Sequence, residues 1–222
     1  MADSIVDKTA PEVQSEPAPP TKGERTRTRI LDVAYDAIVH KGFAATSIEE
    51  LVEAAGITKS GFFYHFRDKN DLARQLLERF LAEDNEILDT LTERARSLCD
   101  DPLQSFLVFL NLYAEVMDEM PDLHPGCLVA TITYQDQMFD AEVRRMNRDS
   151  VLALRQRFAD WLAEVADRYP PASIVDVNAL ADQVTVVVEG GIILSKALGD
   201  RKLMGRQMRL FRDHVKTVFA AS

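Results

Sequence analysis

Residues 46–69, TSIEELVEAAGITKSGFFYHFRDK, decide the fold, because they are typical of two short helices joined by a tight turn, with a further helix beginning. Thr46 and Ser47 can each cap a helix N-terminus, and each has a glutamate three residues later, as a capping box requires. Gly56 can take the left-handed conformation that ends such a helix, and Thr58 can cap the next one. This spacing predicts a helix-turn-helix.

The second helix of this predicted motif carries side chains suited to a nucleic acid. The N-terminus of a helix favours phosphate, while hydroxyl, cationic and amide-like groups contact phosphates and base edges. The predicted DNA contacts are Arg27, Thr46, Ser47, Thr58, Lys59, Ser60, Gly61, Phe63, Tyr64, His65 and Lys69. The alternative is ordinary helix packing with the aromatic residues in a core. We expect Phe62 and Phe66, four residues apart, to face the core in either case.

Two longer segments carry a family resemblance. AGITKSGFFYHFRDKNDL, together with the upstream RILDVAYDAIVHKGFAATSIEELVEAAG, resembles the DNA-binding head of the TetR family of transcriptional repressors. The similarity covers residues 28 to about 77. It implies that the recognition helix begins near Lys59. Two positions depart from the family pattern, since Ser60 stands where glycine is usual and Phe63 where tyrosine is usual, and Phe63 has no hydroxyl for a phosphate.

Composition limits the class of protein. The chain has 222 residues, of which 46% are hydrophobic and 28% charged, as in ordinary soluble globular proteins of one or two domains. No unbroken apolar run reaches the roughly 20 residues that span a bilayer, and the N-terminus lacks a basic region followed by an apolar core. We therefore expect a cytoplasmic protein with no membrane partner. Cys99 and Cys127 are too few for a disulfide framework, and we expect neither a metal site nor a cofactor.

The net charge of −10 is unevenly distributed. Residues 22–70 hold eight Lys or Arg against seven Asp or Glu, a balance of +1, whereas residues 1–21 carry −3 and residues 71–222 carry −8. A local basic face is therefore compatible with an acidic chain. Its members would be Arg25, Arg27 and Arg29 at the first helix and Lys59, Arg67 and Lys69 around the recognition helix. Weak nonspecific DNA binding with a steep salt dependence is expected.

The whole chain reads as all-α, with three regions. Residues 1–23, rich in proline and acidic residues, are expected to form a disordered tail. Residues 24–70 would form the three-helix head, beginning with a helix over 25–41. A fourth helix, capped by Asp68 and running toward Cys99, is long enough to link two domains and to transmit a shift between them. The alternative is that it is simply a long helix. Residues 71–222 would form a helical ligand-binding and dimerisation domain.

Aromatic and methionine residues cluster in this second domain, where a helical bundle could enclose a small molecule. The predicted ligand-binding residues are Phe109, Tyr113, Met117, Cys127, Ile132, Trp161 and Glu189. The alternative is that these apolar stripes only fill a core.

The last two helices, expected at 178–198 and about 201–219, are where the TetR family dimerises. Gly190 and Gly191 are each costly inside a helix, by about 1 kcal/mol relative to alanine, so a close helix approach is the expected compensation. The predicted dimer contacts are Val186, Gly190, Ile193, Leu194, Phe211 and Val215.

Gly126-Cys127-Leu128 and the segment EGGIILSKAL resemble a branch of the family that bears a Gly-Cys-Leu triplet and includes repressors responding to acrylate-like or other electrophilic compounds. Cys127 is expected at a helix N-terminus near His124, and both features can lower a thiol pKa and raise its reactivity. The alternative is that Cys127 is a small buried apolar residue.

The sequence therefore predicts a homodimeric repressor that binds a palindromic operator in double-stranded DNA and is released by a small organic effector. A helical enzyme or redox protein using Cys127 with His124 is the first alternative. It is not expected, because no general base with an orienting carboxylate and no glycine-rich phosphate loop accompany these residues. The second alternative is an interaction protein whose head no longer binds DNA, which Phe63 and the acidic net charge favour.

Overall fold

The computed structural model describes residues 19–171 and 174–219, and within these ranges all regular secondary structure is helical, as predicted. The elements are α1 (Lys22–Lys41), α2 (Ile48–Ala54), α3 (Lys59–His65), α4 (Lys69–Leu98), α5 (Pro102–Glu119), α6 (Leu128–Tyr134), the short 3₁₀ helix η1 (Asp136–Met138), α7 (Ala141–Arg168), α8 (Val177–Leu198) and α9 (Leu203–Phe219). Most of the expected N-terminal tail, residues 1–18, lies outside the described residues.

The helix boundaries follow the capping residues. Ser47, Thr58 and Asp68 cap α2, α3 and α4 by accepting a backbone N–H with the side chain. The first helix begins at Lys22 rather than at Arg25, because Thr21 and Glu24 form a reciprocal capping box that the sequence analysis missed. The expected boundary of the tail at residue 23 is therefore wrong, since helix α1 already includes it.

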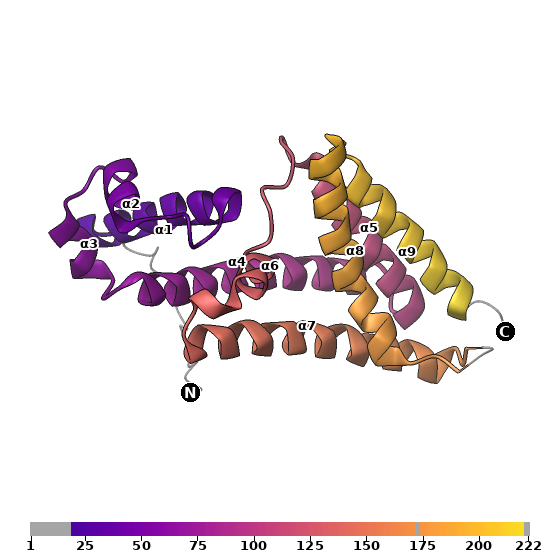
Figure 1. The fold of residues 1–222 in the computed structure, drawn as a ribbon. Coiled ribbons are helices and arrows are strands. Elements are labelled where there is room, and N and C mark those ends of the chain that lie inside the picture. Colours follow the sequence, from indigo (N-terminus) through magenta and orange to yellow (C-terminus); the bar gives the residue numbers. More distant parts are fainter. Residues whose placement is uncertain (1–18, 172–173, 220–222) are drawn as a thin grey trace, which may run out of the picture.

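Helices α1–α3 form a compact head on the N-terminal part of α4 (Figure 1). Phe62 and Phe66 are fully buried there, with ring centroids 5.5 Å apart, which confirms their predicted core position. The head shares its core with other elements. Its buried cluster, called the head cluster below, also includes Leu128 and Ile132 of α6, Phe139 between η1 and α7, and Val143 of α7.

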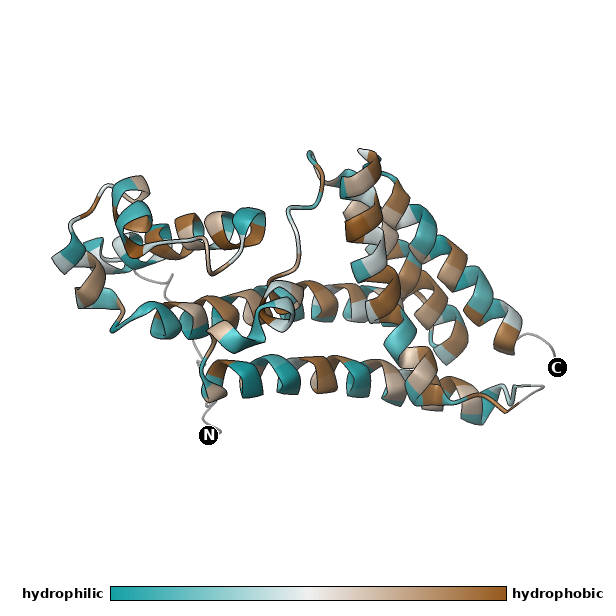
Figure 2. Ribbon diagram, viewed as in Figure 1, coloured by the Kyte–Doolittle hydropathy of each residue, from teal (hydrophilic) through white to brown (hydrophobic). Residues whose placement is uncertain are grey.

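The remaining helices form a bundle with a separate core, called the bundle cluster, built from the distal part of α4 with α5, α7, α8 and α9. Phe106, Phe109 and Trp161 lie at its centre, with ring centroids 5.2 to 6.2 Å apart. Figure 1 shows α4 running from the head into this bundle, alongside α7. Figure 2 shows long hydrophobic segments on α5 and α8. Helix α4 thus physically joins both clusters.

The two glycines of α8 differ in their surroundings. A Cβ on Gly191 would lie 2.9 Å from Cγ and 3.2 Å from Cα of Met204, so α8 and α9 approach each other closely at this point. A Cβ on Gly190 would meet nothing within 4 Å. The expected close approach is therefore present at Gly191 within one chain, and Gly190 faces outward.

Helix α8 is also the one helix of the described residues that is long and apolar enough to cross a membrane by length and composition, with a mean hydropathy of 1.4 over its most apolar window. The sequence analysis had found no such segment, because Asp182, Glu189 and Lys196 interrupt the run. A core helix of a soluble bundle passes the same test, and α8 packs against α9 at Gly191 and carries members of the bundle cluster.

Candidate functional site: a DNA-reading head and an internal cavity

The outer face of α3 presents the predicted DNA contacts to solvent. Tyr64 is 83% exposed and Phe63 45% exposed, and the Thr58, Lys59 and Ser60 side chains are exposed as well. Gly61 and His65 are half-buried. The Thr58 hydroxyl accepts the Gly61 N–H at 3.1 Å and lies 3.0 Å from the Ser60 hydroxyl. The N-terminus of α3 is thus ordered and accessible, as insertion into a major groove requires.

The cations of the head are partly engaged within the protein. Lys59 pairs with Glu49 at 2.6 Å, and both side chains are mostly exposed. Arg27 donates two hydrogen bonds to the Gln75 side chain, which ties α1 to α4. Lys69 donates to the Phe43 carbonyl and lies 4.1 Å above the Phe43 ring. An exposed ion pair such as Lys59–Glu49 contributes little, so Lys59 can exchange its partner for a phosphate at small cost.

Thr46 does not belong to the exposed set. It is 1% exposed, and its hydroxyl donates to the Gly42 carbonyl at 2.9 Å, closing the corner between α1 and α2. The prediction that Thr46 contacts DNA is therefore corrected. Ser47, its neighbour, is exposed and caps α2.

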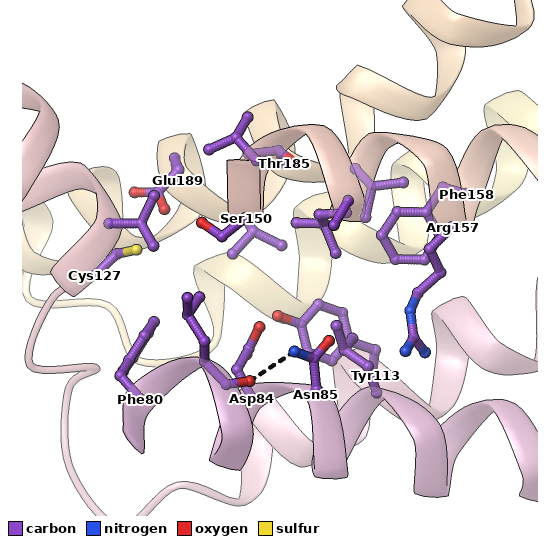
Figure 3. Close-up of a pocket in the computed structure, with 18 of the residues that line it drawn as sticks. Phe80, Asp84, Asn85, Tyr113, Cys127, Ser150, Arg157, Phe158, Thr185 and Glu189 are labelled. Carbon is purple, nitrogen blue, oxygen red and sulfur yellow. Dashed lines mark hydrogen bonds between the residues drawn. The ribbon is translucent and has the colours of Figure 1, made fainter. Parts of the chain in front are cut away.

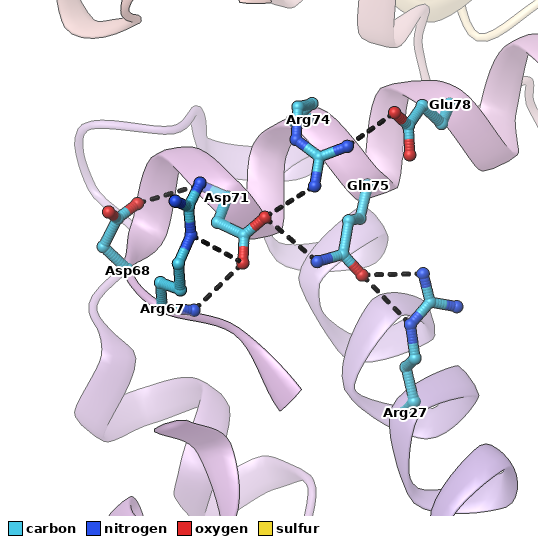
Figure 4. A network of polar contacts seen from close by, with 7 residues as sticks. All are labelled: Arg27, Arg67, Asp68, Asp71, Arg74, Gln75 and Glu78. Carbon is cyan, nitrogen blue, oxygen red and sulfur yellow. Dashed lines mark hydrogen bonds and ion pairs between the residues drawn. The ribbon is translucent and has the colours of Figure 1, made fainter. Parts of the chain in front are cut away.

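A carboxylate at the N3 position of α4 organises the junction between α3 and α4, a role that the sequence analysis did not predict. Asp71 is 6% exposed and accepts the Arg67 N–H, the Gln75 amide and the Arg74 guanidinium at 2.8 to 3.0 Å (Figure 4). Burial alone would raise the pKa of Asp71, but these hydrogen bonds outweigh it and lower the pKa to about 2. Through Gln75 the network reaches Arg27 on α1. In the sequence, Asp71 is recognisable only by its place three residues after the cap residue Asp68.

A cavity of about 500 Å³ lies between the helices of the second domain. Its wall comes from α4, α5, α7 and α8, with Cys127 and His124 from the segment that precedes α6 (Figure 3). The volume is within the range of drug-sized ligand sites.

The cavity lies where the two clusters meet. Phe80 and Val129 from the edge of the head cluster line it, as do Leu88 and Phe158 of the bundle cluster. Phe80 also stacks on Tyr35 of α1, with ring centroids 6.1 Å apart. A cavity-lining ring therefore contacts the head directly.

Three of the seven predicted ligand-binding residues line this cavity: Tyr113, Cys127 and Glu189. Phe109 and Trp161 do not, because both are buried in the bundle cluster, where the Trp161 indole N–H donates to the Pro102 carbonyl at 3.2 Å. Met117 packs against the same cluster. Ile132 lines a second, smaller pocket between α6 and α7. These four residues therefore pack in a core or line the smaller pocket, and the prediction that they line the main cavity is corrected.

Cys127 is the N-cap residue of α6, as expected, but its thiol is not activated. Burial raises the pKa of Cys127, and the Glu189 carboxylate, which accepts a hydrogen bond from the thiol, raises it further to about 12. Burial lowers the pKa of His124, whose Nδ1 accepts the Gly126 N–H at 3.2 Å, so this ring does not supply a positive charge. The expected lowering of the thiol pKa is therefore wrong, because burial and a neighbouring acid outweigh the helix terminus.

The cavity also contains an acid that the sequence analysis missed. Asp84 of α4 is half-buried, and burial raises its pKa; burial likewise raises the pKa of Glu189 of α8. Asp84 follows Phe80 by four residues, one helical turn, so the apolar pattern of α4 could have indicated that it shares the inner face.

The predicted dimer residues separate into two groups. Val186, Ile193 and Leu194 of α8 are 66%, 53% and 46% exposed. Phe211 and Val215 of α9 are instead 5% and 0% exposed within the bundle cluster, so the prediction that they contact a partner is corrected. Leu198 and Leu210, which the sequence analysis did not name, are exposed as well.

Within the described ranges no group of three or more His, Cys, Asp or Glu side chains is arranged to hold a metal ion.

A helix-turn-helix head with an accessible recognition helix, joined by one continuous helix to a bundle with an internal cavity, defines the class of DNA-binding transcriptional regulators. Comparison with known proteins makes this specific. The model of bacterial regulatory proteins of the tetR family matches residues 30–76. The HTH-type transcriptional regulator YvkB of Bacillus subtilis (strain 168) is 34% identical over 197 residues, covering 87% of this chain and 95% of YvkB. The chain therefore belongs to the tetR family.

Other relatives match either a short part of this chain or nearly all of it. AcrR of Shigella flexneri is 39% identical over 64 residues, which are only 29% of each chain. The transcriptional repressor KstR2 of Mycolicibacterium smegmatis is 25% identical over 210 residues, covering 86% of this chain and 98% of KstR2. Among solved structures, regulatory protein TetR from Rhodobacter sphaeroides has a TM-score of 0.71 at 21% identity, with 85% of this chain and 98% of that one covered. That likeness concerns the fold.

Proposed function

We propose that this protein is a homodimeric repressor of the cytoplasm that occupies a palindromic operator and leaves it when a small organic molecule enters the cavity. The observation that carries the proposal is the route from cavity to head: the ring of Phe80 lines the cavity and stacks on Tyr35 of α1. A ligand that repositions this ring acts directly on the head.

Further contacts support the same coupling. Phe43 of the α1–α2 corner packs on Phe139, with centroids 4.3 Å apart, and Gln135 after α6 accepts the Ala44 N–H at 3.2 Å. Arg79 of α4 pairs with Asp32 of α1 at 2.7 Å. The head is thus attached to α4 and to the α6–α7 junction. A ligand that binds one arrangement of these helices better than another shifts the population, and with it the spacing of two heads on DNA.

The dimer in this proposal forms through the outward face of α8. Val186, Gly190, Ile193 and Leu194 recur at helical spacing on that face. An exposed apolar stripe of this kind is typical of an interface, and a two-fold axis through it would pair α8 and α9 with the same helices of a second copy.

The effector in this proposal binds without a covalent bond. The raised pKa of Cys127 argues against thiol chemistry, both for an electrophile sensor and for an enzyme that would use this residue as a nucleophile.

The test is a gel-shift titration of the purified protein on the intergenic DNA beside its own gene, across a salt series. We expect two protomers per palindrome and affinity that falls steeply with salt. Lys59→Ala should reduce the salt slope by about two, one for each protomer on the palindrome, and should weaken binding at least about tenfold on all sequences. Lys216→Ala, an exposed lysine on α9 far from the head in sequence and fold, is the matched control. An affinity unchanged by Lys59→Ala would refute the assigned recognition surface.

A further inference from the structure

Two carboxyl groups stand out in the otherwise largely apolar lining of the cavity. Most of the lining is aliphatic or aromatic, yet Asp84 of α4 and Glu189 of α8 both present carboxyl groups to it (Figure 3). They come from helices on opposite sides of the cavity, and Tyr113 of α5 lines the same cavity. Burial raises the pKa of the Tyr113 hydroxyl, and the charges of Asp84 and Glu189 raise it further.

The negative charge of these carboxyl groups is compensated only in part, because the nearby charge of Arg157 lowers the pKa of Asp84 against the larger, opposite effect of burial. Asp84 makes no hydrogen bond or ion pair with any other residue that the structure describes. The Cys127 thiol is the hydrogen-bond partner of Glu189. Arg157, the cation in the lining, is ion-paired with Asp89 at 2.5 Å. His124 is the other titratable base, and burial and the charge of Lys196 lower its pKa, so it stays neutral.

Tyr113 adds an independent observation. Its side chain is only 8% exposed, and its hydroxyl has no hydrogen-bond partner among residues 19–171 and 174–219. The hydroxyl oxygen is not among the fully buried atoms that lack a partner, so it is open to the cavity, where water or a ligand can bind it. An unsatisfied hydroxyl at the wall of a cavity is a group that a ligand can satisfy.

We propose that the cavity takes an amphipathic organic cation, whose ammonium or amidinium group lies between Asp84, Glu189 and the Tyr113 hydroxyl. Its aliphatic or aromatic body packs on Phe80, Leu88 and Phe158. This inference rests on the proposed function, since it names the chemical class of the effector. A cation supplies a compensating charge to both carboxyl groups and hydrogen-bond donors to Asp84 and the Tyr113 hydroxyl, which have no such partner among the described residues, and the low dielectric of the cavity strengthens the attraction.

The test uses calorimetric titration of the full chain with octylamine, octanol and octanoate, which share one alkyl chain and differ in charge. At neutral pH we expect octylamine to bind at least about tenfold tighter than octanol, and octanoate to bind least, since hydrogen bonds to charged groups are the stronger ones. Asp84→Asn and Glu189→Gln should each weaken octylamine about tenfold and leave octanol unchanged. Glu86→Gln, an exposed acid on the same helix as Asp84, is the control and should change neither affinity.

Octanol or octanoate binding as tightly as octylamine would overturn the inference, as would an octylamine affinity that neither substitution changes. Tight octanoate binding would instead assign recognition to Arg157. Operator release is measured separately by gel shift. Selective octylamine binding without release supports the cation site and counts against the proposed effector response. Operator binding without octylamine binding supports the DNA-binding role and overturns the cation site.

Discussion

Replacing Asp71 by asparagine tests the junction between the recognition helix and α4. The carboxylate is 5% exposed and accepts three hydrogen bonds from Arg67, Arg74 and Gln75. Asparagine has nearly the same shape but no charge, and its amide group presents donors where the protein already supplies donors. The substitution therefore removes the electrostatic part of the network with little change in volume.

The magnitude follows from the pKa of Asp71, which these hydrogen bonds lower from 3.8 to about 2 in spite of burial. A difference of just under two pH units, at about 1.4 kcal/mol per unit, corresponds to about 2.5 kcal/mol of folding free energy. Because the pKa of the folded state is depressed, this stability is present above the unfolded-state pKa and is lost as pH falls toward 2.

The assay is urea unfolding of wild type and Asp71→Asn at a series of pH values from 7 downward. The variant should be less stable by about 2.5 kcal/mol at neutral pH, and the gap should shrink as pH falls from about 4 toward 2. Glu78→Gln is the control, because Glu78 is the 48% exposed partner of Arg74 at the rim of the same network and should contribute under about 1 kcal/mol. A gap that stays constant across this pH range would refute the account of the Asp71 network.

Three further predictions address the bundle. Gly190→Ala and Gly191→Ala share a helix-propensity gain of about 1 kcal/mol, but only Gly191→Ala crowds Met204, so it should be the less stable in urea unfolding by about 1–3 kcal/mol. Ile193→Asp places a charge on the exposed face of α8 and should convert the proposed dimer to a helical monomer in sedimentation equilibrium. Cys127, with its pKa raised to about 12, should react with iodoacetamide at pH 8 roughly a thousandfold more slowly than free cysteine, as measured by peptide mass spectrometry.

Each of these three predictions would be refuted by a specific result. Equal stability of the two glycine variants would show that α8 and α9 have room for a methyl group at this point. A dimer that survives Ile193→Asp would place the interface on another surface. Rapid alkylation of Cys127 in the folded protein would show that the thiolate is accessible and stabilised, and would restore the sensor alternative.

Much of the head was predictable because its determinants are local. Ser47, Thr58 and Asp68 each cap a helix by accepting the backbone N–H three residues later, so a short window of sequence contains both partners. The same holds for the left-handed Gly56, with φ of 61°, after α2. Helical periodicity likewise placed Phe62 and Phe66 in the core. The sequence by itself thus determined the fold class, the recognition helix and the order of the helices.

The tertiary structure decided which face of each helix meets which neighbour. An apolar stripe predicts burial but does not say whether a core, a cavity or a partner covers it, so Phe109, Trp161, Phe211 and Val215 were assigned to surfaces that they do not line. The thiol of Cys127 was misjudged for the same reason, because its pKa is raised first by burial among distant segments and then by Glu189, which lies far away in sequence. The burial of a side chain and the charges around it depend on segments that are distant in sequence, and only the packed structure brings those segments together.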